Sequence, residues 1–170
     1  MIDYKGLQEE LYKAIDGLYV LSSDYYRSWA RQVAQRELAR MTKGVSHRES
    51  TRYELRVEFN GSGFAIYWYE ITFVKTSSRV IRLAKMISAP ESGAYKKESF
   101  KHASEWELQL ILNAEEYLAP VRNQLKNLLK AHRSILFAAR AGGNKLTAVP
   151  IKNRVEKIQV SVQKLKKQLS

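Results

Sequence analysis

The sequence predicts an α+β domain, in which long N- and C-terminal helices flank a three-stranded antiparallel β-meander, followed by a basic C-terminal helix. Three observations carry this prediction. Apolar residues recur at helical spacing near both ends, an alternating run and a continuous apolar run separated by turn residues occupy the middle, and 170 residues suit one domain. With 45% hydrophobic residues the chain can bury a core. We assign residues 1–143 to the α+β domain and residues 144–170 to a linker and a basic amphipathic helix.

The N-terminal part has the spacing of a helix. Between positions 7 and 33, apolar residues recur at steps of three, four or multiples of these, which predicts a helical face within residues 3–41. Residues 22–24 (Ser-Ser-Asp) prefer helix N-caps, so one long helix and two consecutive helices both remain open. The polar residues 42–50 predict a loop.

Three strands follow. Residues 53–59 alternate strictly between apolar and polar, and residues 60–63 (Asn-Gly-Ser-Gly) suit a hairpin turn. Residues 64–74 are apolar on both faces, which predicts a central strand covered on two sides. Residues 80–87 predict a third strand, whose basic side chains suit an exposed edge.

A second long helix is predicted after the strands. Ser104 and Glu107 have the spacing of a capping box at its start, and Gly142-Gly143 is a stop signal. Pro120 lies inside it and predicts either a kink or a junction between two helices. Apolar residues between positions 155 and 169 then follow a heptad spacing, so this segment either packs on the body, pairs with a partner helix or orders on binding.

The positive charge is uneven along the chain. The sequence has 29 basic and 17 acidic residues, a net charge of +12. Residues 1–121 hold 17 basic and 16 acidic groups, whereas residues 122–170 hold 12 basic groups and one acidic group. A cationic segment on a nearly neutral body is typical of a protein that meets a polyanion, most commonly nucleic acid. The alternative is a solvated basic tail without a dedicated partner.

A helical wheel sharpens this prediction. At 100° per residue, five basic residues of the second long helix fall within about 80° of one another. We expect this stripe to contact DNA phosphates. Phe137 lies inside the stripe, where it can stack on a base or pack against the C-terminal helix. The five residues are Arg122, Lys126, Lys130, Arg133 and Arg140.

Further DNA-binding candidates lie beside the stripe and beyond it. Amides and guanidinium groups can read base edges, so Asn123, Gln124, Asn127 and the loop from Arg48 to Arg52 are candidates for base contacts. The last helix is a second cationic element, whose alternative interpretation is a solubilising tail. Its lysines are Lys164, Lys166 and Lys167.

Catalytic and metal-binding functions find little support. The chain has no Cys, its three His are far apart in sequence, and it lacks nucleotide-binding loops and a nucleophile elbow. We expect His132 to be a satisfied core residue, and Glu70 to pair with Arg82 or Arg56 across the sheet. The prediction is a non-enzymatic protein with no cofactor and no metal. Without an apolar run of about 18 residues, we expect a cytoplasmic protein that does not enter a membrane.

The strand segment Ile66–Val74, together with Glu105-Trp106-Glu107-Leu108, resembles the MobI family of conjugative transfer proteins. The resemblance covers roughly residues 20–140. It implies an accessory factor of plasmids and other mobile genetic elements that binds an origin of transfer and assists a relaxase. The expected partners are double-stranded DNA and a relaxase or another relaxosome protein, and a second copy of the chain is kept open.

Two alternatives remain. One is a protein-interaction adaptor whose C-terminal amphipathic helix pairs with an acidic partner helix. The other is an RNA-binding protein that stacks bases on Tyr67, Tyr69 and Phe73, although we expect the flanking helices to cover these rings.

Overall fold

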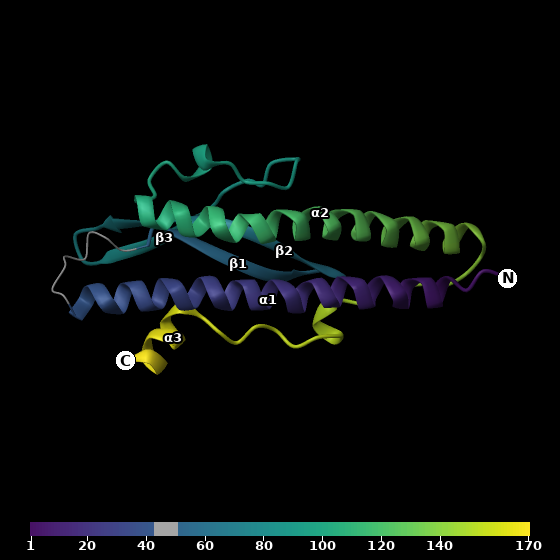
Figure 1. Ribbon diagram of the computed structural model, residues 1–170. Helices are drawn as coiled ribbons and strands as arrows, with labels where there is room; N and C mark the ends of the chain where they lie inside the picture. Colours follow the sequence, from purple (N-terminus) through teal and green to yellow (C-terminus); the bar gives the residue numbers. More distant parts are fainter. Residues whose placement is uncertain (43–50) are drawn as a thin grey trace.

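The computed structural model describes residues 1–42 and 51–170 and has the predicted fold class (Figure 1). Two long helices and an antiparallel three-stranded sheet form the body, and short helical segments occupy the connections. In chain order the elements are α1 Tyr4–Thr42, β1 Tyr53–Asn60, β2 Gly63–Lys75, β3 Val80–Met86, η2 Lys97–Phe100, α2 Glu105–Ala141, η3 Ile151–Asn153 and α3 Val162–Leu169.

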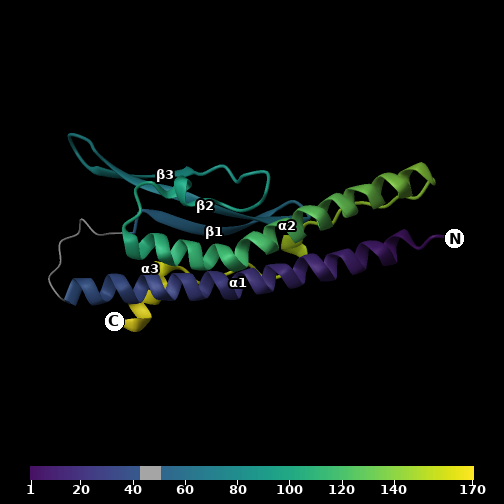
Figure 2. The same ribbon diagram turned by 45° about the horizontal axis from the view of Figure 1, so that its top comes forward.

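The helices α1 and α2 run antiparallel and side by side, and the sheet packs against them (Figures 1 and 2). The C-terminal segment returns along α1 and ends in α3. Both views show the start of α1 and the end of α2 extending past the sheet as a two-helix arm. This arm is the part of α2 on which the sequence predicted the cationic stripe.

Helix α1 is continuous across residues 22–24. The Ser22 hydroxyl donates to the carbonyl oxygen of Leu18 at 2.7 Å, and the Ser23 hydroxyl donates to that of Tyr19 at 2.8 Å. Both serines are buried and bond back into the preceding turn, so neither caps a new helix. Of the two alternatives left open by the sequence, the single long helix is correct.

The sheet has the strand order β1-β2-β3, with Leu55 opposite Trp68 and Val57 opposite Ile66. These four side chains are buried, and Trp68 meets Trp29 of α1 edge to face at 5.6 Å between ring centroids. The prediction that β2 is covered on two sides is wrong for its last four residues, which are exposed together with nearly all of β3. The core side chains of β2 end at Ile71, so the end of the β2–β3 hairpin stands clear of the core.

Helix α2 runs without a break through Pro120 and curves in Figure 2. Ser104 is its N-cap residue, as predicted, but the Ser104 side chain makes no capping hydrogen bond. The Glu107 carboxylate instead accepts the backbone N–H groups of Arg52, at 2.9 Å, and Tyr53, at 3.2 Å. The predicted capping box is therefore wrong, because Glu107 holds the start of β1.

The C-terminal segment packs on the body. Arg154 forms a salt bridge with Asp16 at 2.8 Å, and the Ile158 N–H donates to the Tyr19 hydroxyl at 3.0 Å. Helix α3 covers only Val162–Leu169, so the predicted heptad seam from position 155 is wrong over its first half. Residues 156–160 satisfy their backbone partly through α1 side chains rather than through helical bonds.

Candidate nucleic-acid interface

Four of the five predicted stripe residues are exposed: Lys126 beside the end of the sheet, and Lys130, Arg133 and Arg140 on the arm. They follow one line along α2, which spans about 21 Å at 1.5 Å per residue. Phe137 lies in the same line and is 59% exposed, so of the two alternatives left open it does not pack against the C-terminal helix. We call these four cations the α2 stripe.

Arg122 is not part of the exposed stripe, and the prediction that it points outward is wrong. Its side chain is only 9% exposed and forms a salt bridge with the buried Glu115, with nitrogen–oxygen distances of 2.7 and 2.9 Å. It also donates to the carbonyl oxygens of Ile66 at 3.0 Å and Gly93 at 2.7 Å. Its guanidinium group lies 4.7 Å from the centre of the Tyr95 ring. Arg122 therefore joins α2, β2 and the loop after β3.

The sheet explains why residues on one side of α2 differ so much in solvent exposure. At Arg122 that side of the helix faces β2. Two turns later, Leu129 lies against Gly63, the first residue of β2. A Cβ atom at Gly63 would approach a Leu129 methyl group to 2.8 Å. Past this contact the sheet has ended, so the same side of α2 is open to solvent. A helical wheel cannot show where a neighbouring sheet stops.

The α2 stripe carries charge that the other described residues do not neutralise with salt bridges. Among the described residues, no carboxylate forms a salt bridge with Lys130, Arg133 or Arg140. Lys126 donates to the backbone carbonyl oxygen of Glu91 at 3.2 Å, which leaves its charge in place. Unpaired cations spaced along one helix face are suited to neutralising a row of phosphates.

The predicted base-reading residues divide between the middle of α2 and its N-terminal end. Asn123, Gln124 and Asn127 flank the stripe and are exposed. The Asn127 amide donates to the Asn123 carbonyl oxygen at 3.0 Å, and the Asn123 side chain lies against Gly93. Arg52 lies at the other end, beside Glu107 in the first turn of α2, and Arg48 is outside the described residues. The structure therefore does not bring Arg52 to the stripe.

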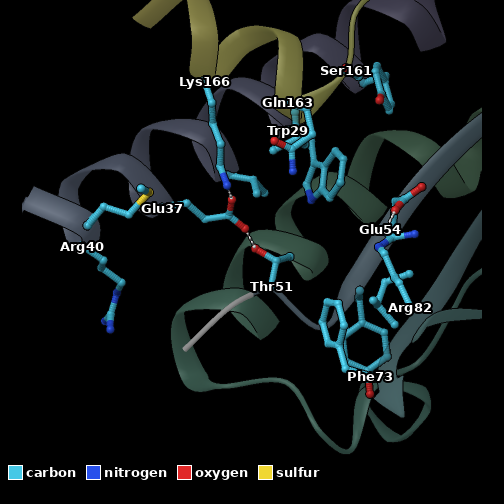
Figure 3. Close-up of a pocket in the computed structure, with 16 residues that line it drawn as sticks. Trp29, Glu37, Arg40, Thr51, Glu54, Phe73, Arg82, Ser161, Gln163 and Lys166 are labelled. Atoms are coloured by element: carbon cyan, nitrogen blue, oxygen red, sulfur yellow. Dashed lines mark hydrogen bonds and ion pairs between the residues drawn. The ribbon is translucent and has the colours of Figure 1, made fainter. Parts of the chain in front are cut away.

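The lysines of α3 also lie away from the stripe, next to the C-terminal end of α1 (Figure 1). Lys166 forms a salt bridge with Glu37, which also accepts the Thr51 hydroxyl at 2.7 Å (Figure 3). Lys164 donates to the Gln159 carbonyl oxygen at 2.9 Å, and Lys167 is exposed. The cations of the last third therefore do not form one surface, in contrast to the sequence prediction.

Lys166 and Glu37 line a cavity of about 630 Å³ between α1, the sheet and α3 (Figure 3). Trp29 and Phe73 supply apolar walls. Opposite Lys166, Arg82 pairs with Glu54. These two ion pairs neutralise charge on both sides of the cavity, so its walls offer less free positive charge than the α2 stripe.

The structure also tests the predictions made for His132 and Glu70. His132 is buried, 3.2 Å from the Gln8 amide and beside the Tyr12 ring, as predicted for a satisfied core residue. Burial lowers its pKa. Glu70 pairs with His102, whereas Arg56 and Arg82 both bind Glu54, so the predicted partner of Glu70 is wrong.

The rings considered for RNA stacking are less covered than expected. Phe73 is 58% exposed, so the prediction that the helices cover it is wrong. Tyr67 and Tyr69 alternate with the buried Ile66 and Trp68 and are half-buried. The Arg56 guanidinium lies 4.0 Å from the centre of the Tyr69 ring and occupies that face.

Within residues 1–42 and 51–170, no cluster of three or more His, Cys, Asp or Glu side chains has a geometry that could hold a metal ion. The helices of the same residues contain no stretch that is both long enough and apolar enough to cross a bilayer.

The fold and the stripe define an α+β protein whose two-helix arm presents unpaired positive charge beyond a small sheet. The family model described as MobI protein matches residues 21–136, more than half of the chain, and the chain therefore belongs to the MobI family of mobilisation accessory proteins. The matched region includes Lys126, Lys130 and Arg133 and ends before Arg140. No curated protein and no solved structure is significantly similar to the chain.

Proposed function

We propose that this mobilisation accessory protein binds double-stranded DNA through the α2 stripe, without catalysing a reaction itself, and assists a relaxase during conjugative transfer. The observation that carries the proposal is the row of Lys126, Lys130, Arg133 and Arg140, which is exposed and forms no salt bridge with a carboxylate of residues 1–42 and 51–170. Family membership supports a role in a mobilisation complex. The exposed ring of Phe137 gives the row an apolar contact for a sugar or a base.

The size of the stripe sets the expected salt dependence. Four phosphate contacts correspond to a slope of about −3.6 in a plot of log K against log salt concentration. Binding then weakens roughly 100-fold between 50 and 200 mM salt. Such contacts position a protein on DNA but do not select a sequence. Exposed amides beside the stripe, including Gln124, are the proposed source of sequence preference.

The test is a mobility-shift titration of duplex DNA at several salt concentrations with the variant Lys130→Glu/Arg133→Glu. Binding should weaken on every duplex, and the salt slope should become shallower by about 2, because two phosphate contacts are lost. Both side chains are exposed, so the midpoint of urea unfolding should not change. In the presence of Mg²⁺, the wild-type protein should leave the duplex uncut.

The matched control is Lys152→Glu/Lys157→Glu, which changes the net charge equally at two exposed positions of the C-terminal segment. If both double variants weaken binding to the same extent, the effect comes from net charge and the stripe is not the interface. If the stripe variant keeps the wild-type affinity and slope, the proposal fails.

A further inference from the structure

The end of the β2–β3 hairpin, residues 72–86, is the most exposed apolar surface of the described sheet. Five large apolar side chains in it are between 44% and 61% exposed. They are not needed by the DNA-binding stripe, which lies on the two-helix arm (Figure 2). The five residues are Phe73, Val74, Val80, Leu83 and Met86. Exposed apolar side chains gathered on one element are typical of an interaction site.

The outer edge of β3 offers free backbone groups. Strand β3 pairs with β2 on one side, and no other strand of the described residues pairs with it. The Thr76 N–H donates to the Arg79 carbonyl oxygen at 2.8 Å, and the Ile87 N–H donates to that of Trp68 at 2.9 Å. Because bonded positions alternate in an antiparallel pair, odd-numbered residues of β3 bond to β2 and even-numbered ones face outward. The outward-facing residues are Val80, Arg82, Ala84 and Met86.

The charge of the hairpin restricts what can pair with this edge. Residues 71–90 contain four basic residues and no acidic residue. A second copy of β3 would place basic side chains against basic side chains, which destabilises strand pairing. A strand with acidic side chains would gain favourable cross-strand pairs with Arg79 and Lys85, whereas Arg82 already pairs with Glu54 and Lys75 lies on β2. The basic residues are Lys75, Arg79, Arg82 and Lys85.

We propose that β3 docks an extended segment of a partner protein, in which acidic and apolar residues alternate, as a fourth strand of the sheet. Main-chain hydrogen bonds to the even-numbered residues would hold this segment, and its acidic side chains would select the basic edge. DNA would neutralise the cations but leave apolar side chains exposed on the hairpin, so a protein segment matches the surface better. This proposal concerns a different surface from the α2 stripe and does not depend on DNA binding.

The probe is a short fluorescein-labelled peptide in which Glu alternates with Val and Thr, and binding is measured by fluorescence anisotropy on the full-length protein. A second peptide with Lys in place of every Glu tests the choice of charge. Amide hydrogen exchange followed by NMR tests the docking mode. The Glu peptide should bind more tightly than the Lys peptide, and it should protect the amides of Arg82 and Ala84 more than those of Ile81 and Leu83.

Two variants separate the backbone contribution from the charge contribution. The Ala84 N–H faces the open edge, so Ala84→Pro removes an outward donor without removing a bond to β2. Arg79→Glu/Lys85→Glu reverses two exposed charges and leaves the salt bridge between Arg82 and Glu54 intact. Each variant should weaken peptide binding by about tenfold, the equivalent of a few lost edge contacts. Lys152→Glu/Lys157→Glu should bind the peptide like the wild type.

Several results would overturn the proposal. Equal binding of the Glu and Lys peptides would exclude charge selection, and wild-type peptide binding by Ala84→Pro would exclude strand addition. A wild-type protein that is dimeric in sedimentation, and becomes monomeric on Ala84→Pro, would identify a second copy as the occupant. Loss of duplex DNA binding in the hairpin variants, with no peptide binding by the wild type, would identify DNA. The stripe variant Lys130→Glu/Arg133→Glu should bind the peptide normally, which keeps the two proposals distinguishable.

Discussion

Arg122 gives the sharpest test of the structure, because the sequence placed it on a DNA-binding surface and the structure places it in the core. We predict that Arg122→Met lowers the free energy of unfolding by about 3–5 kcal/mol, the cost of breaking a buried ion pair by removing one partner. The change removes a bidentate contact with Glu115 and leaves that carboxylate in a buried site. It also leaves the carbonyl oxygens of Ile66 and Gly93 without their guanidinium donor.

Urea unfolding followed by circular dichroism measures this effect, with the exposed Lys130→Met as the matched control. For a chain of this length the loss corresponds to a decrease of roughly 10 °C in the melting temperature. The double variant Glu115→Gln/Arg122→Met should be more stable than the sum of the single changes implies, because it leaves no unpaired buried charge. Glutamine at position 115 can still accept the Trp68 indole N–H, now 2.8 Å from the carboxylate. A wild-type unfolding midpoint in Arg122→Met, combined with weaker DNA binding, would refute the buried position.

Two further predictions concern other buried charges. Burial raises the pKa of Glu107 to about 7 from its ordinary 4.5, so the folded state binds a proton more tightly than the unfolded state. The free energy of unfolding should therefore fall as the pH rises from about 4.5 to about 7, by up to about 3 kcal/mol. Glu107→Gln should remove this part of the pH dependence in urea unfolding curves, and an unchanged slope would contradict it. Asp16→Asn breaks the salt bridge with Arg154 and should speed amide exchange at Ile158, whereas the exposed Asp24→Asn should not. Equal exchange in both Asp variants would show that this salt bridge does not hold the C-terminal segment.

Most of the secondary structure could be predicted from the sequence because it follows local rules. Alternation predicted β1, a continuous apolar run predicted β2, and the Asn-Gly-Ser-Gly turn predicted the first hairpin. An error arose where a side chain uses a distant partner, because Glu107 suits a capping box but binds the start of β1. Ser22 and Ser23 suit an N-cap but bond back into the preceding turn of α1, which decides between the two alternatives that the sequence left open. The sequence shows where a residue suited to capping stands, but it does not show which backbone groups the side chain of that residue will bind.

The candidate interface could be predicted only in part, for a related reason. Helical periodicity placed the stripe cations on one side of α2, and the structure confirms that four of them are exposed. Helical periodicity could not show that β2 covers this side of α2 at Arg122. Comparing residues 1–121 as a whole with residues 122–170 also concealed a second basic region. Residues 72–101 hold seven basic and two acidic groups, whereas residues 105–121 hold four acidic groups and no basic ones. Averaging the two made the first part of the chain look neutral.

The pairing of charges across the chain determines which experiments can test the proposed DNA-binding surface. Arg154 and Lys166 in the C-terminal segment neutralise Asp16 and Glu37 of α1. Deleting residues 144–170 would therefore remove the cationic partners of Asp16 and Glu37 and would also remove the buried Ile151 from the core. A loss of DNA binding after such a deletion would report on folding as much as on contact. Point reversals on the arm change only exposed side chains, so a defect they cause can be assigned to the interface itself.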